Sequence, residues 1–385
     1  MCGKTAVKFE SATKKSAWLP VTGYTKHEND KQLLQIRLSS GRSVVVTEDH
    51  SLMVMGEAGH LVPAFPQDLK IDRTRLPVAM LPLEASQSMP KDLGVLIGLY
   101  LSEGHCPPSQ PGLIMLSVKP PDRIAEILVL LQRMGHTPQP KHSGGCVNFT
   151  SHEVCEFLVE NFGHLSGNKR IPDWVFQTTS EFRWSVLSGY MAGDGNIWAD
   201  HNGSLQVTGV STSVALRDGL VELAATLGIF CTIFDAPRQY LNANWNDAYG
   251  FRLTSQDLLL SLTDIPLFFY SDREAKFRAI LKPQYRPSTF TAVPVANTRS
   301  ARKLLYAGFS HATAYVHKVA AAKGAVTSSK LATSTNVFGK WGRSDVRWDK
   351  VVAIEPVPHQ DWVYDLSVAD SECFAVDHGL IVHNT

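Results

Sequence analysis

The sequence contains no apolar run that approaches the roughly 20 residues needed for a membrane-spanning helix. No signal-peptide-like stretch follows the first residues either, so we expect a cytoplasmic protein with no membrane partner. Disorder is not expected, because hydrophobic residues make up 44% of the 385 positions and charged residues only 19%. A chain of this length can bury a full core and is predicted to hold two or more domains.

Cysteine is scarce, and no two cysteines form a Cys-x-x-Cys pair. This dispersion argues against both a disulfide framework and a structural zinc site. Most of the six are therefore expected to be small buried side chains. Their positions are Cys2, Cys106, Cys146, Cys155, Cys231 and Cys373.

Acidic residues are missing from one long stretch, between Ala275 and Ser344, although the formal net charge of the chain is only +1. A solvated surface normally mixes both signs, so a basic block of this length favours a polyanionic partner, and we predict DNA. The alternative is a basic insertion without a ligand. The predicted DNA-contacting residues are Arg286, Arg299, Arg302, Lys303, Lys318, Lys323, Lys330, Lys340 and Arg343.

The pattern of the sequence changes along the chain. Residues 7–81 are typical of short β-strands broken by turns, residues 91–283 alternate between helical and β patterns, and β patterns return from Val346. The basic segment has helical periodicity over residues 300–323, with an apolar stripe of Leu304, Leu305, Phe309 and Val316. A β-domain on both sides of an α/β unit indicates that one domain is inserted into a loop of another.

The α/β unit contains an internal repeat, at residues 92–104 and 184–195. Aligned on the acids Glu103 and Asp194, the copies stand 91 positions apart. In each copy small residues recur at every fourth position, which on a helix makes a smooth stripe that lets two backbones approach closely. The two stripes are Gly94, Gly98 and Ser102, and Ser185, Gly189 and Gly193.

Each helix predicted from the repeat ends in an acid followed by glycine. A carboxylate at a helix C-terminus is unfavourable by itself, and packing along the small stripes would bring Glu103 and Asp194 together. Two such carboxylates need a cation, and Mg²⁺ suits their hard oxygen atoms. Beside a basic groove, this site predicts hydrolysis of a phosphodiester. The alternative is a pair of ordinary buried helices with solvated terminal acids.

Leu-Ile-Gly-Leu-Tyr-Leu-Ser-Glu-Gly at 96–104 and Leu-Ser-Gly-Tyr-Met-Ala-Gly-Asp-Gly at 187–195 resemble the motifs of LAGLIDADG homing endonucleases. The resemblance implies a pseudo-twofold α/β saddle that cuts double-stranded DNA, with Glu103 and Asp194 as Mg²⁺ ligands. Lys-Arg-Ile-Pro at 169–172 matches the family's Lys-x-Ile-Pro block, which implies that Lys169 is the active-site lysine. Lys282 is the candidate for the symmetric position.

The sequence ends in Val-His-Asn-Thr. The side-chain amide of Asn384 can attack its own backbone carbonyl and cleave the next peptide bond, and His383 can protonate the leaving amine. The hydroxyl of Thr385 can accept an acyl group. A tetrapeptide of this kind is weak evidence by itself, because it recurs by chance.

Two further blocks support a splicing reaction. Residues 40–50 resemble the intein Thr-x-x-His block, through Thr47 and His50, and residues 363–368 resemble the Tyr-Asp-Leu block, through Asp365. The chain therefore resembles inteins and the related Hedgehog-type autoprocessing domains. This resemblance implies an all-β Hint horseshoe formed by both chain ends, with the endonuclease inserted between them.

The resemblance also implies a role for each end of the chain. Cys2 would attack the preceding carbonyl to form a thioester, while Thr47 and His50 strain and protonate the scissile amide. Cys2 stands only 48 residues before His50, however, and the usual opening block of the family is shortened or missing. If Cys2 is not the nucleophile, upstream cleavage fails while cyclisation of Asn384 can survive alone.

The later steps would pass the acyl group to Thr385 and cyclise Asn384, with Asp365 coordinating the first and last steps. The histidine that the family usually carries before the phenylalanine of the later block is replaced by Glu372 here. His378 is the candidate substitute, and the alternative is a slow last step.

These observations predict a multi-domain chain. Its expected segments are residues 2–88 and 345–384 for the splicing domain, 89–284 for the endonuclease and 285–344 for a small basic helical DNA-contacting insertion, with residue 385 as the first flanking residue. The predicted function joins splicing to site-specific, Mg²⁺-dependent DNA cleavage in a monomer embedded in a host protein. The alternatives are a stand-alone endonuclease, and a DNA-binding module with decayed catalysis that retains only C-terminal cleavage.

Overall fold

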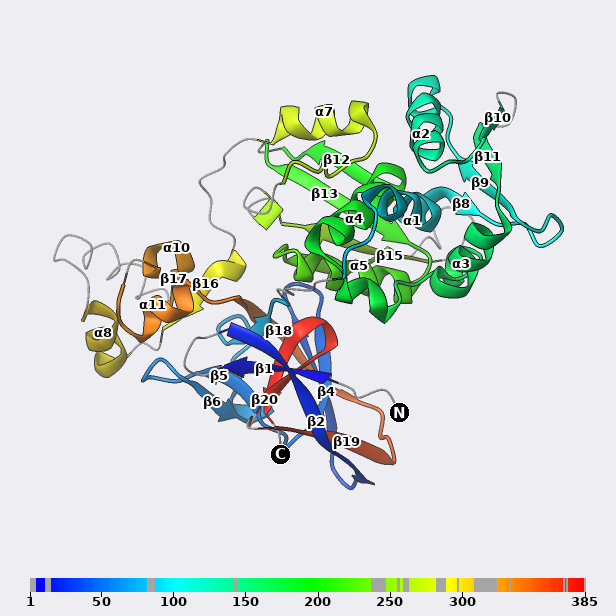
Figure 1. Cartoon of the computed structure of the whole chain (residues 1–385). Coiled ribbons are helices and arrows are strands. Elements are labelled where there is room, and N and C mark those ends of the chain that lie inside the picture. Colours follow the sequence, from blue (N-terminus) through cyan, green and yellow to red (C-terminus); the bar gives the residue numbers. More distant parts are fainter. Residues whose placement is uncertain are drawn as a thin grey trace. The chain divides into compact units, whose positions relative to one another are not determined.

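The computed structural model describes residues 5–10, 15–81, 87–141, 145–201, 203–236, 247–254, 257–258, 263–281, 289–295, 298–307, 324–332, 334–369, 371 and 373–383. The chain divides into two compact units (Figure 1). The first combines residues 1–82 with 286–385, and the second comprises residues 83–285. Both ends of the chain therefore belong to the same compact unit. No helix in the described ranges is long and apolar enough to cross a membrane.

An eleven-stranded sheet forms most of the first unit. Its strands are β1 (Thr5–Glu10), β2 (Lys15–Glu28), β3 (Leu33–Leu38), β4 (Ser43–Thr47), β5 (Leu52–Met55), β6 (Leu61–Ala64), β7 (Arg75–Ala79), β18 (Val346–Val357), β19 (Trp362–Val368), β20 (Cys373–Val376) and β21 (Leu380–His383). Two short 3-10 turns accompany them, η1 (Pro66–Asp68) and η5 (Asp377–Gly379).

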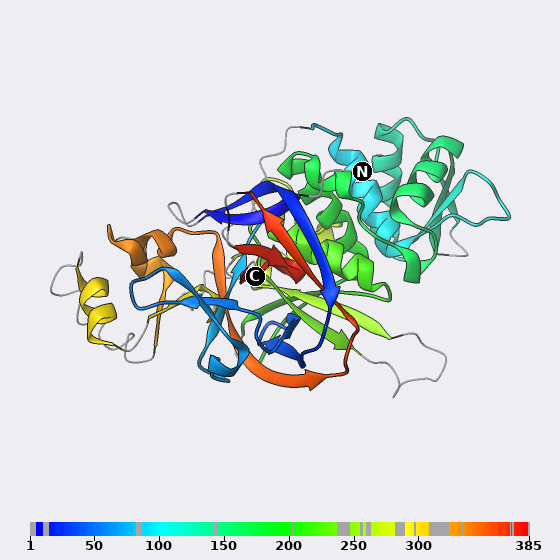
Figure 2. The same cartoon turned by 90° about the horizontal axis from the view of Figure 1, so that it is seen from below.

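Strands from the two ends of the chain alternate within this sheet. The order along the main path is β19-β2-β1-β20-β21-β7-β18-β3-β4, and β5 joins β21 to β6. Figure 1 and Figure 2 show the blue N-terminal strands side by side with the red C-terminal strands. Long-range pairing of this kind fixes the two ends of the chain together. The predicted Hint arrangement and segment boundaries stay predictions.

The basic segment does not form a compact unit of its own, because it groups with the first unit. Its elements are η4 (Thr289–Thr291), β16 (Ala292–Pro294), α8 (Arg299–Tyr306), β17 (Ala325–Thr327), α10 (Ser328–Leu331) and α11 (Val337–Gly342). The apolar side of α8 is buried through Ala301 and Leu305, and the side chain of Thr298 caps its first turn. The predicted stripe residues Phe309 and Val316 lie outside the described residues.

Tryptophan packing joins the basic segment to the sheet. The ring of Trp341 in α11 meets the ring of Trp348 in β18 edge to face, with centroids 5.2 Å apart, and both are buried. Trp341 Nε1 also donates a hydrogen bond of 2.8 Å to the carbonyl oxygen of Gly59. Buried aromatic pairs of this kind contribute to stability beyond their burial, so the segment is part of the core of the unit.

The second unit is built from two halves of the same order. The first half contains α1 (Lys91–Glu103), β8 (Gly104–His105), β9 (Leu113–Ser117), α2 (Pro121–Arg133), β10 (Gln139–Lys141), β11 (Cys146–Thr150) and α3 (His152–Phe162). The second contains α4 (Ser180–Asp194), β12 (Gly195–Ala199), β13 (Leu205–Ser211), α5 (Val214–Thr226), β14 (Cys231–Ala236), β15 (Ala248–Leu253) and α7 (Ser271–Ile280). Between them lie η2 (Ser166–Asn168) and η3 (Asp173–Gln177).

The two sheets of this unit also match, with the orders β8-β9-β11-β10 and β12-β13-β15-β14. All of their pairings are antiparallel. A repeat that the sequence revealed only at its helices therefore extends over seven successive elements in each half.

Helices α1 and α4 pack along their small residues, as the sequence predicted. A methyl group on Gly98 would overlap the main chain of α4 at Gly189, and one on Gly189 would overlap the main chain of α1. Gly94 faces Ser185 in the same way. The matched contacts are 91 positions apart, which is the spacing of the repeat itself. Two helices that touch backbone to backbone hold their C-terminal ends together.

Gly98→Ala is expected to destabilise the second unit. The added methyl group has no space because its neighbours are backbone atoms of α4, so the helices must separate, at a cost of about 1–3 kcal/mol. Chemical denaturation of the full chain, followed by tryptophan fluorescence, measures the loss. Gly167→Ala is the matched control, because no atom of another residue lies near a Cβ at that position. Equal stability of both variants would contradict this account of the packing.

Candidate functional site

The C-terminal ends of α1 and α4 bring two acids to one place. Glu103 is the last residue of α1 and Asp194 the last of α4. A Cβ on Gly193 would lie only 2.7 Å from Cγ of Glu103, so the two helix ends are in contact. Burial raises the pKa of Glu103, while the positive charges of Lys169 and Arg273 oppose this rise. The site thus combines carboxylates with nearby cations in a half-buried setting.

Lys169 holds the end of α1. Its side chain is buried and its Nζ donates to three carbonyl oxygens, at 2.6 Å to Tyr100, 3.1 Å to Leu101 and 3.0 Å to Gly104. Burial lowers the pKa of Lys169 to about 8, although attraction to Asp194 and Glu103 acts in the opposite direction. A cation at this position offsets the negative end of the helix dipole, next to the acid that ends the helix.

Arg273 of α7 holds the end of α4 in the same manner, and sequence reasoning missed it. Its guanidinium donates to the carbonyl oxygens of Ala192 at 2.8 Å and Gly193 at 3.0 Å, and also to that of Gly195. Arg273 is therefore the geometric counterpart of Lys169 in the second half. The two residues follow their acids at different spacings, so the repeat gave no signal for Arg273.

Lys282, predicted for that symmetric position, lies outside the described residues. Its role stays a prediction, whereas Arg273 occupies the corresponding place at the end of α4.

The acids fit a hard divalent cation. Within the described residues no group of three His, Cys, Asp or Glu side chains could hold a metal ion, so the assignment of Glu103 and Asp194 as a pair of metal ligands stays a prediction. Mg²⁺ commonly binds through one or two carboxylates and completes its octahedron with water and phosphate oxygens. A pair of carboxylates therefore suits Mg²⁺ and leaves coordination positions for other oxygen ligands.

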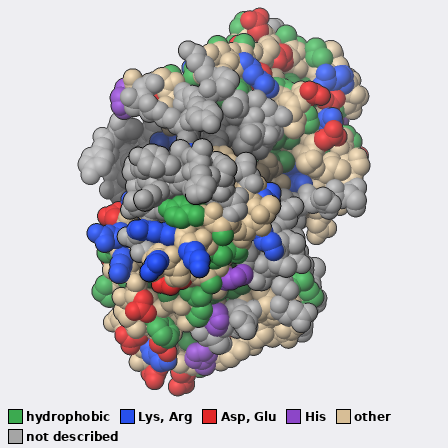
Figure 3. Space-filling model, turned by 90° about the vertical axis from the view of Figure 1, so that its left-hand side faces the viewer, with side chains coloured by type: hydrophobic (Ala, Val, Ile, Leu, Met, Phe, Trp, Pro, Cys, Tyr) green, Lys and Arg blue, Asp and Glu red, His purple; other side chains and the backbone are tan. Residues whose placement is uncertain are grey.

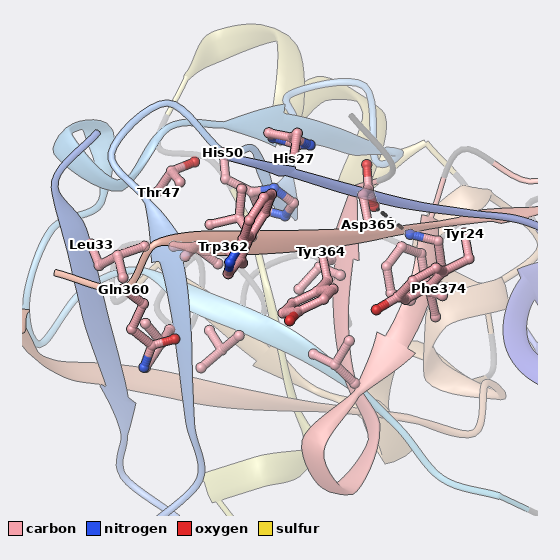
Figure 4. A pocket seen from close by; sticks show the side chains of 17 residues that line it. Tyr24, His27, Leu33, Thr47, His50, Gln360, Trp362, Tyr364, Asp365 and Phe374 are labelled. Atoms are coloured by element: carbon pink, nitrogen blue, oxygen red, sulfur yellow. Dashed lines mark hydrogen bonds between the residues drawn. The ribbon is translucent and has the colours of Figure 1, made fainter. Parts of the chain in front are cut away.

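A second group of predicted residues surrounds a cavity of about 590 Å³ in the first unit. Thr47 ends β4, His50 follows it in a turn closed by a 3.0 Å bond from the His50 amide to the Thr47 carbonyl, and Asp365 lies in β19. Figure 4 shows Thr47, His50 and Asp365 on the wall of this cavity. Val382, in the last strand, lines it as well.

His383 is the last residue of β21, directly after Val382. Burial lowers the pKa of His50, Asp365 acts to raise it, and the charge of His383 acts to lower it further. These three side chains are therefore close enough to interact electrostatically, although they come from three separate parts of the sequence. The structure thus brings His383 of the terminal motif near residues of the two sequence blocks, His50 and Asp365.

His378 does not reach this group. The β20–β21 hairpin pairs Cys373 with His383 at one end and Val376 with Leu380 at the other, and His378 lies in the turn beyond that second pair. The strand geometry separates the two ends of the hairpin by about 10 Å. His378 also has a left-handed backbone, with φ +60°, as the tight turn requires. The suggestion that His378 replaces the missing imidazole is therefore wrong.

Comparison with known proteins identifies the family. The family model described as the intein splicing domain matches residues 3–384. The chain belongs to the intein splicing domain family. This confirms the assignment that Thr47, His50, Asp365 and the terminal motif suggested.

Several curated proteins are similar to this intein. One is the DNA-directed RNA polymerase subunit Rpo1C of Methanocaldococcus jannaschii, 24% identical over 426 residues, which span 96% of this chain and 48% of that protein. Another is the DNA polymerase of Thermococcus litoralis, 25% identical, with 77% of this chain and 16% of that protein aligned. The intein thus spans about half the length of the first relative and much less of the second.

Solved structures that resemble part of the intein have low similarity to it. A crystal structure of I-DmoI in complex with DNA and Ca has a TM-score of 0.35 and 11% identity, over 49% of this chain and 97% of that one. The homing endonuclease I-WcaI bound to its DNA recognition sequence has a TM-score of 0.33 and 14% identity, over 50% of this chain and 88% of that one.

Four residues of the predicted splicing chemistry lie outside the described residues of the intein. They are Cys2, Glu372, Asn384 and Thr385. The strands next to them are described, since β20 begins at Cys373 and β21 ends at His383. The roles of these four residues stay predictions.

The basic segment of the intein presents several of its cations to solvent. Arg299, Lys303, Lys330, Lys340 and Arg343 are exposed, while Arg302 is half-buried. Figure 3, which looks onto the side of α8, α10 and α11, shows lysine and arginine side chains gathered on that face. Arg343 also serves the fold, because it donates to the carbonyl oxygen of Ser334 at 3.0 Å. The predicted contacts Arg286, Lys318 and Lys323 lie outside the described residues.

Proposed function

We propose that the intein excises itself from a host polypeptide, joins the two flanks, and carries an inserted endonuclease that cuts double-stranded DNA. The observation that most supports splicing is the shared sheet. Strands of both chain ends alternate in it, Thr47, His50 and Asp365 line one cavity, and His383 is close enough to His50 to interact electrostatically. A splicing reaction needs this convergence, since it breaks bonds at both ends of the domain.

At the upstream junction, the Cys2 thiol would attack the preceding carbonyl carbon. An S–C bond forms, the C–N bond breaks, and the amide nitrogen must gain a proton as it leaves. His50 is suited to this transfer, because burial lowers its pKa and keeps the imidazole neutral at pH 7, ready to receive and return a proton. The Thr47 hydroxyl lines the same cavity and can bind the strained peptide.

At the downstream junction, the acyl group would pass to the Thr385 hydroxyl. The Asn384 side-chain nitrogen then attacks its own carbonyl carbon and expels the Thr385 amine, which His383 protonates. An acyl shift from oxygen to nitrogen leaves an ordinary peptide bond between the flanks. Asp365 interacts with His50 across the cavity and can therefore adjust the charge there in both the first and last steps.

Expression of the chain between two different folded reporter proteins tests splicing. Mass spectrometry of the products is expected to show joined reporters together with the free intein. Release of the downstream reporter alone would show that the upstream half is inactive. Recovery of only the unprocessed fusion would overturn the proposal.

For the second unit we propose metal-dependent hydrolysis of a phosphodiester. Glu103 and Asp194 would hold Mg²⁺ between the ends of α1 and α4. The ion, when bound, supplies a Lewis acid and lowers the pKa of a coordinated water. Lys169 and Arg273 fix the helix ends that present the two acids. Both acids come from one chain, so the site needs no second copy, and we propose that the intein acts as a monomer.

We propose that the basic segment adds contacts to the DNA backbone. Its exposed cations stand on a rigid module, since α8 and α11 are anchored in the core of the first unit. No acid lies between Ala275 and Ser344 to oppose a phosphate. Contacts of this kind raise affinity without reading sequence and make it dependent on salt.

Replacing Lys303 and Lys340 together with alanine is expected to weaken DNA binding. Each lost phosphate contact lowers the slope of log K against log salt by about 0.9. Fluorescence anisotropy with a mixed-sequence duplex over a range of salt concentrations measures the slope. Lys70→Ala, an exposed lysine of the same unit outside the segment, is the control. An unchanged slope in the double variant would rule out a contribution of this segment to DNA binding.

A further inference from the structure

A second cavity, of about 250 Å³, adjoins the splicing site. Eight of its nine lining residues have polar side chains, and the nine are His27, Glu28, Asn29, Asp30, Lys31, Thr47, Asp49, His50 and Val363. The larger cavity, by contrast, has a mainly apolar wall that includes Val44, Val46, Phe374 and Val382. A small polar cavity favours water, whereas an apolar one suits a peptide.

Two imidazoles stand where the cavities meet. His27 and His50 both line the polar cavity and the apolar one, as do Thr47 and Val363. His27 is exposed and His50 is half-buried. Figure 4 shows His27 and His50 at the same end of the apolar cavity, near Asp365. The imidazole of His27 therefore lies between solvent and His50, where it can take part in proton transfer.

The register of β2 with β19 fixes which way His27 points. Thr25 pairs with Asp365 and His27 pairs with Val363, and residues that oppose each other across a ladder share a face. His27 and Asp365 therefore lie on one face of this ribbon. The ribbon's other face carries aromatic side chains, including the stacked rings of Tyr24 and Tyr364. The pairing of β2 with β19 therefore puts His27 on the same face as Asp365.

The upstream acyl shift needs a proton at the leaving nitrogen at the moment the C–N bond breaks, while the Cys2 thiol releases one as its S–C bond forms, so no net proton is consumed. A buried imidazole whose pKa is lowered holds few protons at neutral pH, so delivery of a proton to His50 can limit the rate. The ionisable groups that face His50 and His27 come from several elements. They are Glu28, Asp30, Lys31, Asp49, Asp365 and His383. Lys31 and Asp49 form an ion pair with each other.

We propose that His27 is a positioning residue that relays protons from the polar cavity to His50 during splicing. The inference rests on the proposed splicing function. A hydronium ion or buffer acid gives its proton to one ring nitrogen of His27, and the other ring nitrogen passes a proton to His50. His50 gives a proton to the amide nitrogen as the C–N bond breaks, which regenerates both neutral imidazoles. The Cys2 thiol loses its proton to solvent water as the S–C bond forms, which replaces the proton taken up by His27. The relay involves no oxidation or reduction.

The test compares the wild-type chain with His27→Gln and His27→Ala, each between two reporter proteins. The rate of thiol-induced upstream cleavage is measured from pH 6 to pH 8.5. Near pH 6 the variants should match the wild type, because water in the cavity can protonate His50 directly. Near pH 8 they should be about tenfold slower, which is less than the loss of a direct acid–base group, because His27 acts through His50 and water can partly replace it. Added imidazole should restore the rate of His27→Ala.

His359→Gln is the matched control, because His359 is an exposed histidine of the same unit that lines neither cavity. Its pH profile should overlay that of the wild type. Rates in the His27 variants that equal the wild type at every pH, or that are lowered equally at every pH without rescue by imidazole, would overturn the relay and leave splicing intact. A wild-type chain that releases neither reporter would overturn the splicing function itself, and the relay with it.

Discussion

Replacing Asn384 with alanine is expected to stop release of the downstream flank. Alanine has no side-chain nucleophile, so the peptide bond after residue 384 can break only by ordinary hydrolysis. The rate of that cleavage should fall by at least about a hundredfold, the low end of what positioned acid–base chemistry contributes. The upstream acyl shift does not use Asn384, and the thioester or branched ester should therefore accumulate.

The geometry supports this separation of the two reactions. His383 is the last residue of β21, and β21 pairs with β20 on one side and with β7 on the other. Strand pairing therefore fixes the position of the backbone from which the downstream junction continues. Thr47 and His50 come from β4 and the turn after it, and the backbone amide of His383 donates a hydrogen bond to the carbonyl oxygen of Ser51, the residue after His50. Loss of one nucleophile leaves the residues that serve the other junction in place.

Mass spectrometry of a fusion with two reporters distinguishes the outcomes. For Asn384→Ala, addition of a thiol should release the upstream reporter while the downstream reporter stays attached. His50→Ala should give the reverse result, with upstream release slowed and downstream release retained. Normal joining of the reporters in Asn384→Ala would contradict the cyclisation mechanism.

A second large effect is expected from Asp194→Asn in the endonuclease unit. The substitution removes one of two charged ligands while keeping its size, and the remaining Glu103 cannot hold Mg²⁺ at the same site. Loss of partners that merely orient metal ligands costs about 10–100-fold, so loss of a ligand should reduce cleavage by at least about a hundredfold. Binding to DNA should persist, because the basic segment lies in the other unit.

A plasmid library of randomised sites, incubated with Mg²⁺ and sequenced at its new ends, measures this cleavage. Glu156→Gln is the matched control, since Glu156 is an exposed carboxylate in α3 of the same unit, away from both helix ends. Its cleavage should equal that of the wild type. Cleavage by Asp194→Asn at the wild-type rate would eliminate the two-carboxylate site. Absence of cleavage by the wild-type chain would favour the alternative of a DNA-binding module with decayed catalysis.

The paired helices illustrate what local sequence can predict. The small residues at every fourth position and the acid-glycine endings predicted both the contact face and the last residues of α1 and α4. The glycines after the acids are required by close packing and not by a left-handed helix stop. Gly104 and Gly195 are in extended rather than left-handed conformation, and a Cβ on either would overlap the last turn of its own helix.

Other parts of the site had no local signal. Arg273 reaches the end of α4 from a helix that begins 77 positions after Asp194, and nothing in its own neighbourhood distinguishes it from a surface arginine. His27 is one of 14 histidines, and only the register of β2 with β19 puts it on the face of Asp365. For His378 the sequence suggested a contact that the structure does not form. His378 is near His383 in the sequence, but the β20–β21 hairpin holds the two residues at opposite ends.

The sequence by itself determined the family and the repeat, and it named candidates for the reactive residues. Periodicity, turn residues and nucleophiles are properties of short segments, so a reader of the chain can recognise them one at a time. Tertiary structure decided which of them meet. It alternated strands of both ends in one sheet, placed a cation at the end of each paired helix, and merged the basic segment with the core of the first unit. Those outcomes depend on long-range strand register and side-chain packing, in which each residue's position is set by partners hundreds of positions away.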